Sequence, residues 1–259
     1  MNDTHRLLQT MDLDIEIGNV QVCQNLNWTV NENEVWGILG LNGVGKTTLL
    51  NTISGLLEAT SGQVLFQNKA LDQWSHKALA RELGYLFQSL SHEFPQTVHE
   101  FCADALYPYI NQWQNMSVAQ QQIISDALIA TEMSQHHERL INSLSGGEKR
   151  RTEIAGLLVQ NPRLWLLDEP VNHLDLRHQM QIMQVLISAA HKRSGGIISI
   201  FHDPNLARHF CTHILLLKGN GNYETGICEN MLTAEKLSQL YQQPVIELKD
   251  KDKSAFIAD

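Results

Sequence analysis

The stretch LGLNGVGKTT, which follows the apolar run Val35–Leu39, is the feature that most constrains how this chain can fold. Its glycines reach backbone conformations that are costly for other residues, so successive N–H groups can turn inward and surround an anion. Lys46 adds a full positive charge, and the helical pattern Thr48–Gly55 adds the partial positive charge of a helix N-terminus. This order of strand, glycine loop, lysine and helix fits the pattern G-x-x-x-x-G-K-[ST] and predicts a loop that binds phosphates.

A glycine-rich surface turn beside an exposed lysine is the alternative, and it does not account for the strand and helix on either side. In the phosphate-binding interpretation, the Thr47 hydroxyl is also a ligand for Mg²⁺. The loop residues that we expect to contact the nucleotide are Gly40, Leu41, Asn42, Gly43, Val44, Gly45, Lys46, Thr47 and Thr48.

Short apolar runs recur along the chain, and runs of this length are typical of strands that are buried on both faces of a parallel sheet. They are Val35–Leu39, Leu83–Phe87, Leu164–Leu167, Ile197–Phe201 and Ile214–Leu217. Earlier in the chain the apolar residues alternate, with Leu13, Ile15 and Ile17 on one face of a strand. This period of two predicts an antiparallel edge sheet.

Between Phe87 and Leu164 the pattern is helical, in the segments Val98–Tyr107, Val118–Ala130 and Gly147–Gln160. We therefore expect one α/β domain over 1–259, with a P-loop NTPase core that contains a parallel sheet (1–88 and 161–259). An N-terminal antiparallel β-subdomain and an inserted helical subdomain (89–160) complete it. Near the C-terminus we expect a short helix Ala234–Tyr241 and then a solvated, frayed end at Lys249–Lys253.

Composition excludes several classes of function. With 19 Lys and Arg against 28 Asp and Glu, the net charge is −9, which disfavours nucleic-acid binding because phosphate contacts need clustered cations. No apolar run approaches the roughly 18–20 residues that span a bilayer. The first residues lack a basic stretch followed by an apolar one, so we expect no signal peptide. The four cysteines are scattered and are expected to be reduced thiols in a cytosolic protein.

Acidic residues follow the run Leu164–Leu167 directly. Asp168 is a candidate ligand for Mg²⁺, and Glu169 is a candidate to orient or deprotonate the attacking water. An exposed acidic turn before Pro170 is the structural alternative.

Two further runs end in polar residues, Gln88 after Leu83–Phe87 and His202 after Ile197–Phe201. Either residue alone would be interpreted as structural or exposed. Ligands of open α/β sheets, however, bind beyond the carboxyl ends of the strands. We therefore expect Gln88 near Mg²⁺ or water and His202 near the γ-phosphate.

The stretch LSGGEKRR has two interpretations that the residues leave open. Ser145 and Glu148 are spaced as a capping box before a helix. Gly146 and Gly147 are nevertheless poor helix formers, and the cations that follow lie near the positive end of the helix dipole. An anion at the helix start would explain the glycines by close approach and the cations by charge.

These motifs, together with Asn172-His173-Leu174-Asp175, occur in the order of an ABC-type ATPase, and the chain resembles that family over nearly its whole length. The resemblance implies an ATPase that acts as a homodimer, in which Ser145, Gly146 and Gly147 of one subunit close over ATP in the loop of the other. It implies catalytic roles for Lys46, Gln88, Glu169 and His202, and it implies that Asp175 links the two sites. It also implies that Mg²⁺ is bound by Thr47, Gln88 and Asp168.

Some positions depart from the family pattern. Ile17 stands where an aromatic residue usually stacks on adenine, so it offers apolar contact alone. Asn33 replaces a glycine and should tolerate the left-handed conformation. Val171 replaces a small hydroxyl residue, with no functional interpretation.

A finer resemblance, in the residues after Gln88, in Asn172–Gln179 and in the tail Leu232–Val245, is to ATPases of importers for iron–siderophore complexes, haem or cobalamin. It implies integral membrane permease subunits, a periplasmic solute-binding protein and a place on the cytoplasmic face of the inner membrane. An exporter ATPase and a soluble ABC protein outside transport remain alternatives.

Overall fold

The computed structural model describes residues 6–89, 95–110, 116–250 and 253–259. Residues 1–5, on which the absence of a signal peptide was judged, and 251–252 of the tail lie outside this description. The chain divides into two compact units, Met1–Trp74 with Gly196–Asp259, and Ser75–Gly195. The segment 89–160, expected as a helical subdomain, lies within the second unit.

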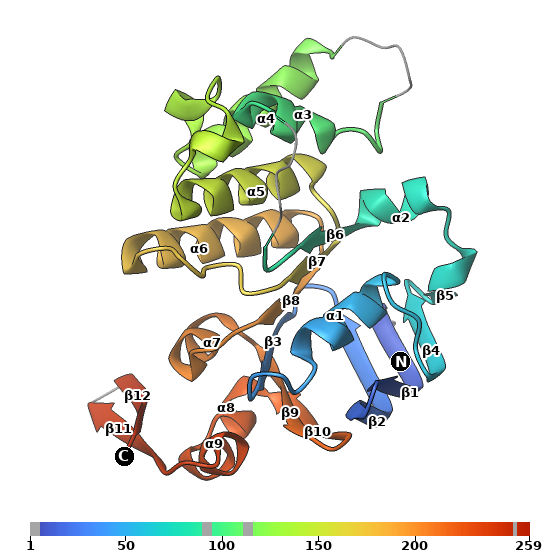
Figure 1. The fold of residues 1–259 in the computed structure, drawn as a ribbon, viewed down its shortest axis with the longest axis vertical. Helices are drawn as coiled ribbons and strands as arrows, with labels where there is room; N and C mark the ends of the chain where they lie inside the picture. The colour runs from blue at the N-terminus through green and yellow to red at the C-terminus, as the bar shows by residue number, and fades with distance from the viewer. Residues whose placement is uncertain (1–5, 90–94, 111–115, 251–252) are drawn as a thin grey trace. The chain divides into compact units, whose positions relative to one another are not determined.

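The first unit contains an antiparallel sheet and a sheet with parallel strands (Figure 1). The antiparallel sheet has the strand order β2-β1-β4-β5. Its strands are β1 (Arg6–Ile17), β2 (Val20–Asn31), β4 (Ser61–Phe66) and β5 (Lys69–Ala70). In the other sheet, β10, β9, β3 and β8 are successive neighbours, and β3 runs parallel to both β8 and β9. These strands are β3 (Val35–Gly40), β8 (Gly196–Ile200), β9 (His213–Gly219) and β10 (Asn222–Ile227). Helix α1 (Lys46–Ser54) contacts β1, β2 and β3, and so packs between the two sheets.

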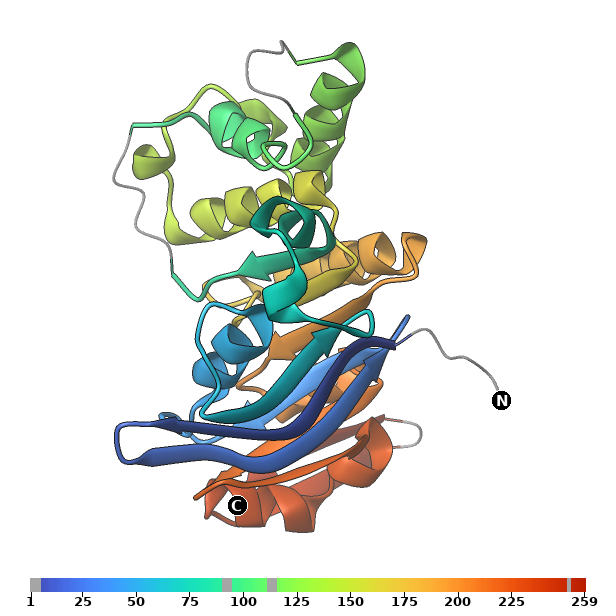
Figure 2. The ribbon, with the colours of Figure 1, turned by 90° about the vertical axis from the view of Figure 1, so that its right-hand side faces the viewer.

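The long β1–β2 hairpin confirms the antiparallel edge sheet (Figure 2). Leu13 and Ile15 are buried, as their alternation predicts. Ile17, the third apolar residue of this alternation, is 48% exposed. Ile17 pairs with Val20 at the tip of the hairpin, beyond the packed part of the sheet.

The C-terminal part of the first unit is more ordered than we expected. Helices α7 (Pro204–Phe210), α8 (Cys228–Met231) and α9 (Ala234–Tyr241) are followed by β11 (Val245–Asp250) and β12 (Lys253–Ala258). Helix α9 has the predicted bounds. The predicted frayed end is wrong over its described residues, because β11 and β12 pair as an antiparallel hairpin.

The second unit combines a parallel strand pair with helices. Strands β6 (Leu83–Leu86) and β7 (Leu164–Leu167) are parallel. The helices of this unit are α2 (His76–Glu82), α3 (Val98–Asp104), α4 (Val118–Ala130), α5 (Gly146–Gln160) and α6 (Leu176–Lys192). Short 3-10 turns span Ser134–His136 and Ile141–Ser143 in this unit and Leu71–Gln73 in the first unit. Helix α5 contacts α3, α4 and β6. Over the described residues, none of the helices is both long enough and apolar enough to cross a membrane.

Candidate functional site

The loop between β3 and α1 has the backbone that its glycines predict. Gly43 and Gly45 have φ angles of 77° and 103°, in the left-handed region. A Cβ on Gly45 would lie 2.5 Å from Cγ2 of Val22, and one on Gly40 would lie 2.7 Å from the carbonyl oxygen of Leu217. Close packing at Gly40, and packing and backbone conformation together at Gly45, therefore require glycine.

Lys46 begins helix α1 and its side chain turns back over the loop. Its Nζ donates to the carbonyl oxygens of Gly40 at 2.8 Å and Leu41 at 3.0 Å. The residue is 7% exposed. The first four N–H groups of a helix have no partner within the helix, so the start of α1 offers donors beside this ammonium. The arrangement suits an anion such as a phosphate group.

The strand ends of the first unit also bring His202 to the loop. Ile38 in β3 lies opposite Ile200 in the parallel strand β8. The N–H of Phe201 donates to the carbonyl oxygen of Ile38 at 3.2 Å, so His202 leaves the sheet at the edge where the loop begins. The side chain of His202 is exposed.

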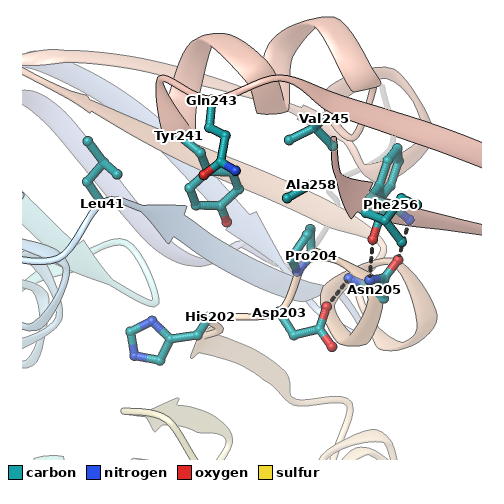
Figure 3. Close-up of a pocket in the computed structure, with 11 residues that line it drawn as sticks. Leu41, His202, Asp203, Pro204, Asn205, Tyr241, Gln243, Val245, Phe256 and Ala258 are labelled. Carbon is teal, nitrogen blue, oxygen red and sulfur yellow. Dashed lines mark hydrogen bonds between the residues drawn. The ribbon is translucent and has the colours of Figure 1, made fainter.

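A cavity of about 490 Å³ adjoins His202 and Leu41, and α9 and the β11–β12 hairpin form its other walls (Figure 3). Burial raises the pKa of the Tyr241 hydroxyl in this wall to about 12. Asn205 fastens the hairpin to α7, because its amide donates to the carbonyl of Phe256 at 3.0 Å and accepts from its N–H at 2.7 Å. The tail thus lies directly beside the segment that carries His202.

In the second unit, β6 and β7 bring Gln88 and Asp168 to one edge. Leu86 pairs with Leu167, and the N–H of Asp168 donates to the carbonyl oxygen of Leu86 at 2.9 Å. Asp168 is fully buried, whereas Gln88 is exposed. Gln88 and Asp168 therefore follow two neighbouring parallel strands at the same edge.

Glu169 has an unusual backbone for a residue with a side chain. Its φ is 50°, in the left-handed region, which costs about 1–3 kcal/mol and persists where surrounding contacts enforce it. The side chain is buried, and the amide of Asn172 donates to its carboxylate. The carbonyl of Glu169 also accepts from the N–H of Asn172 at 3.2 Å. The alternative of an exposed acidic turn is therefore wrong for both Asp168 and Glu169.

The start of α5 is a complete capping box. The Ser145 hydroxyl accepts from the N–H of Glu148, and the Glu148 carboxylate accepts from the N–H and hydroxyl of Ser145, both at 2.8 Å. These bonds lower the pKa of Glu148, the backbone N–H most strongly. The capping interpretation is confirmed, and contact with a nucleotide through Ser145 and the exposed Gly146 stays a prediction. Gly147 has a structural reason too, since its Cβ would lie 3.2 Å from the carbonyl oxygen of His173.

Two of the cations near this helix start have internal partners. Arg150 donates to the carbonyls of Phe87, Asp168, Glu169 and Pro170, and Arg151 donates to those of Thr131 and Glu132. A bound anion is therefore not needed to explain them. Sequence reasoning identified Arg150 only as a positive charge and missed these contacts. It also missed Asn172 as the partner of Glu169, although the three-residue spacing between Glu169 and Asn172 was a signal.

Asp175 caps helix α6. Its carboxylate accepts from the N–H of His178 at 3.0 Å and contacts Nδ1 of the same residue at 2.8 Å. These bonds, the backbone one first, lower the pKa of Asp175. Its expected role between two subunits stays a prediction.

The three positions that depart from the family pattern are Asn33, Val171 and Ile17. Asn33 has a φ of 63°, which confirms that this turn needs a residue that tolerates the left-handed conformation. Val171 is 4% exposed, so its side chain is a packing residue. Ile17, at the tip of the β1–β2 hairpin, presents an exposed apolar side chain that could contact a base.

Magnesium suits the chemistry of the proposed ligands. The Thr47 hydroxyl, the Gln88 amide oxygen and the Asp168 carboxylate are all oxygen donors, which Mg²⁺ prefers. A single carboxylate among them fits the rule that Mg²⁺ near a nucleotide takes its other ligands from phosphate and water.

A strand, a glycine loop with a buried lysine and a helix, together with a second strand that ends in buried carboxylates, define an ATPase of the P-loop class. The ABC transporter family model matches residues 23–172, and the chain belongs to this family. Its members include the iron(3+)-hydroxamate import ATP-binding protein FhuC of Bacillus subtilis, which is 32% identical over 91% of this chain and 87% of its own length. The hemin import ATP-binding protein HmuV of Shewanella denitrificans is 33% identical over 91% of this chain and 93% of its own.

The fold agrees with this assignment. A solved structure described as an inward-facing conformation of a metal-chelate type ABC transporter superposes with a TM-score of 0.83. It is 25% identical and covers 98% of each chain. The expected P-loop core, antiparallel N-terminal sheet and helical segments are thus confirmed, and the protein is an ABC-type ATPase.

Proposed function

We propose that this protein is the ATP-hydrolysing subunit of an importer whose solute is an iron–siderophore complex, haem or cobalamin. The observation that carries the proposal is the combination of a complete hydrolytic set of residues with similarity to FhuC and HmuV over nine-tenths of the chain. Import rather than export is supported by what these relatives are named for. The same names support the siderophore and haem members of the solute class.

Each residue has a role that its surroundings favour. The loop from Gly40 to Thr48 binds the triphosphate through backbone N–H groups, and Lys46 neutralises its outer charge. His202 donates to the γ-phosphate. Glu169, held by Asn172, orients or deprotonates the attacking water.

Magnesium, when bound, neutralises charge that develops on the phosphates. Thr47, Gln88 and Asp168 are the residues that would hold it. Ile17 contributes apolar contact to adenine.

The active form is a homodimer that sandwiches two nucleotides. Ser145, Gly146 and Gly147 of one protomer contact the ATP bound by the other, and Asp175 links the two sites. Ser145, Gly146 and Asp175 are exposed, as such contacts require. Permease subunits in the inner membrane hold the dimer on the cytoplasmic face, and a periplasmic binding protein delivers the solute.

The variants Glu169→Gln and Lys46→Ala separate nucleotide binding from hydrolysis. With ATP and Mg²⁺, we expect Glu169→Gln to bind nucleotide with only slow residual turnover and to dimerise in light scattering, while Lys46→Ala stays monomeric. A fully active Glu169→Gln protein, or one that is monomeric at saturating ATP both alone and with its permease, would overturn the mechanism. Reconstitution with the permease would then show the direction of transport, and ATP-driven export would overturn the importer assignment.

A further inference from the structure

We infer that Arg150 is a positioning residue for hydrolysis, which fixes the backbone that carries Glu169 and Gln88. This inference rests on the roles proposed for those two residues. Arg150 lies in the second turn of α5, the helix that begins beside Ser145, and it is 5% exposed.

The guanidinium of Arg150 uses its full set of donors. Its Nε donates to the carbonyl oxygen of Pro170 at 3.1 Å, and Nη2 donates to those of Asp168 at 2.6 Å and Glu169 at 2.9 Å. Its Nη1 donates to the carbonyl oxygen of Phe87 at 2.5 Å and to the Glu153 carboxylate at 3.0 Å. These contacts match the five N–H groups of a guanidinium.

These acceptors are arranged around the proposed catalytic residues. Three are consecutive carbonyls, those of Asp168, Glu169 and Pro170, and they bracket the left-handed backbone of Glu169. The fourth carbonyl, that of Phe87, immediately precedes Gln88. Asn172 holds the carboxylate of Glu169, whereas Arg150 holds the peptide groups that set the direction of that carboxylate.

The charge of Arg150 is matched inside the protein. Glu153, one turn further along α5, is also buried and forms the ion pair. With Glu153 as counter-ion, the remaining donors are directed to backbone oxygens. A lysine would keep the charge but would present three donors from one point, so it cannot bridge oxygens of Phe87, Glu169 and Pro170 together.

Arg193 provides a matched control in the same unit. It also donates to a backbone carbonyl, that of Asn161, and to a carboxylate, that of Glu82. Both partners precede the strands β7 and β6, so Arg193 braces the opposite ends of the strand pair that Arg150 braces.

The test compares Arg150→Lys, Arg193→Lys, Glu169→Gln and the double variant Arg150→Lys/Glu169→Gln in the full-length protein. Single-turnover hydrolysis of ATP with Mg²⁺ gives the chemical rate, and competition with a fluorescent nucleotide gives the ATP affinity. We expect Arg150→Lys to slow hydrolysis by about tenfold or more, because small displacements of a catalytic group are costly. Its ATP Kd should change by less than about threefold, and Arg193→Lys should slow hydrolysis by less than about twofold.

The double variant distinguishes a positioning role of Arg150, exerted through Glu169, from a general disturbance of the structure. If Arg150 acts through Glu169, Arg150→Lys should slow the residual hydrolysis of Glu169→Gln by less than about twofold, whereas independent effects would multiply. Should Arg150→Lys fail to fold by circular dichroism, the same criteria apply to Arg150→Met/Glu153→Met, which removes both buried charges. A wild-type rate in the Arg150 variant, or effects that multiply, would overturn the inference. The proposed function fails separately, if the wild-type protein does not hydrolyse ATP.

Discussion

The ammonium of Lys46 lies 2.8 Å from the carbonyl oxygen of Gly40, so the lysine closes the loop whose glycine it follows by six residues. This contact places a compact cation inside the loop. The position and size of this cation therefore matter as much for nucleotide binding as its charge does.

The first prediction uses that distinction. Lys46→Arg keeps the charge, but the planar guanidinium is too large for a position that is 7% exposed. We expect the ATP Kd to rise by about tenfold or more, as measured by isothermal titration calorimetry. Lys236→Arg is the control, since Lys236 pairs with Glu224 at 2.8 Å on the partly exposed side of β10 and should tolerate the change. Equal affinities in both variants would contradict the argument.

The glycines of the loop allow a paired prediction. Gly43→Ala meets no atom within 4 Å and suffers only its positive φ, which costs about 1–2 kcal/mol of unfolding free energy. Gly45→Ala has at least this backbone penalty, at a φ of 103°, and also collides with Val22 at 2.5 Å, which adds about 1–3 kcal/mol. Urea unfolding should rank the variants in this order. In Gly45→Ala/Val22→Ala the total loss should be smaller than the sum of the single losses, because the collision is relieved.

Sequence patterns predicted the parts of this protein that depend on local chemistry. Continuous apolar runs located the parallel strands, and α4 and α9 have the bounds that their periodicity predicted. The β11–β12 hairpin was missed because part of its stabilisation comes from a distant helix, as in the ion pair of Glu247 with Arg208 of α7 at 2.7 Å. The contacts of Arg150 depend on two distant segments, at Phe87 and at Asp168 to Pro170, and no local pattern encodes them.

Ile17 gives a prediction about the base. Its exposed side chain can make apolar contact with adenine but cannot stack. Ile17→Tyr should lower the ATP Kd by about three- to tenfold, the range expected for an added aromatic stack. Inorganic tripolyphosphate, which has no base, is the control ligand, and its affinity should not change. Equal tightening of both ligands would assign the effect to the loop rather than to the base.

The capping box of α5 predicts a dependence on pH. Because hydrogen bonds from Ser145 lower the pKa of Glu148 below its ordinary 4.5, the ionised carboxylate stabilises the folded state. This contribution is complete above pH 4.5 and is lost as pH falls through the lowered pKa. The difference in unfolding free energy between wild type and Glu148→Gln should therefore shrink on acidification in that window. Gln120 takes the place of Glu148 in the capping box of α4 but carries no charge. The effect of Gln120→Ala on the unfolding free energy should therefore be the same above pH 4.5 and on acidification.

The final prediction concerns the hairpin beside His202. Asn205→Ala removes two hydrogen bonds to Phe256, and leaving those backbone groups without partners costs about 1–3 kcal/mol. Because Phe256 is buried while most of β11 is exposed, this loss should appear as local release of 245–259 rather than as global unfolding. Limited proteolysis followed by mass spectrometry should show faster cleavage within the tail, with a melting temperature close to that of the wild type. Asn222→Ala, which removes weaker bonds at 3.3 and 3.4 Å on β10, should leave tail cleavage unchanged. Cleavage at the wild-type rate in Asn205→Ala would mean that contacts of Arg208 with Glu247 and Phe256 hold the hairpin without Asn205.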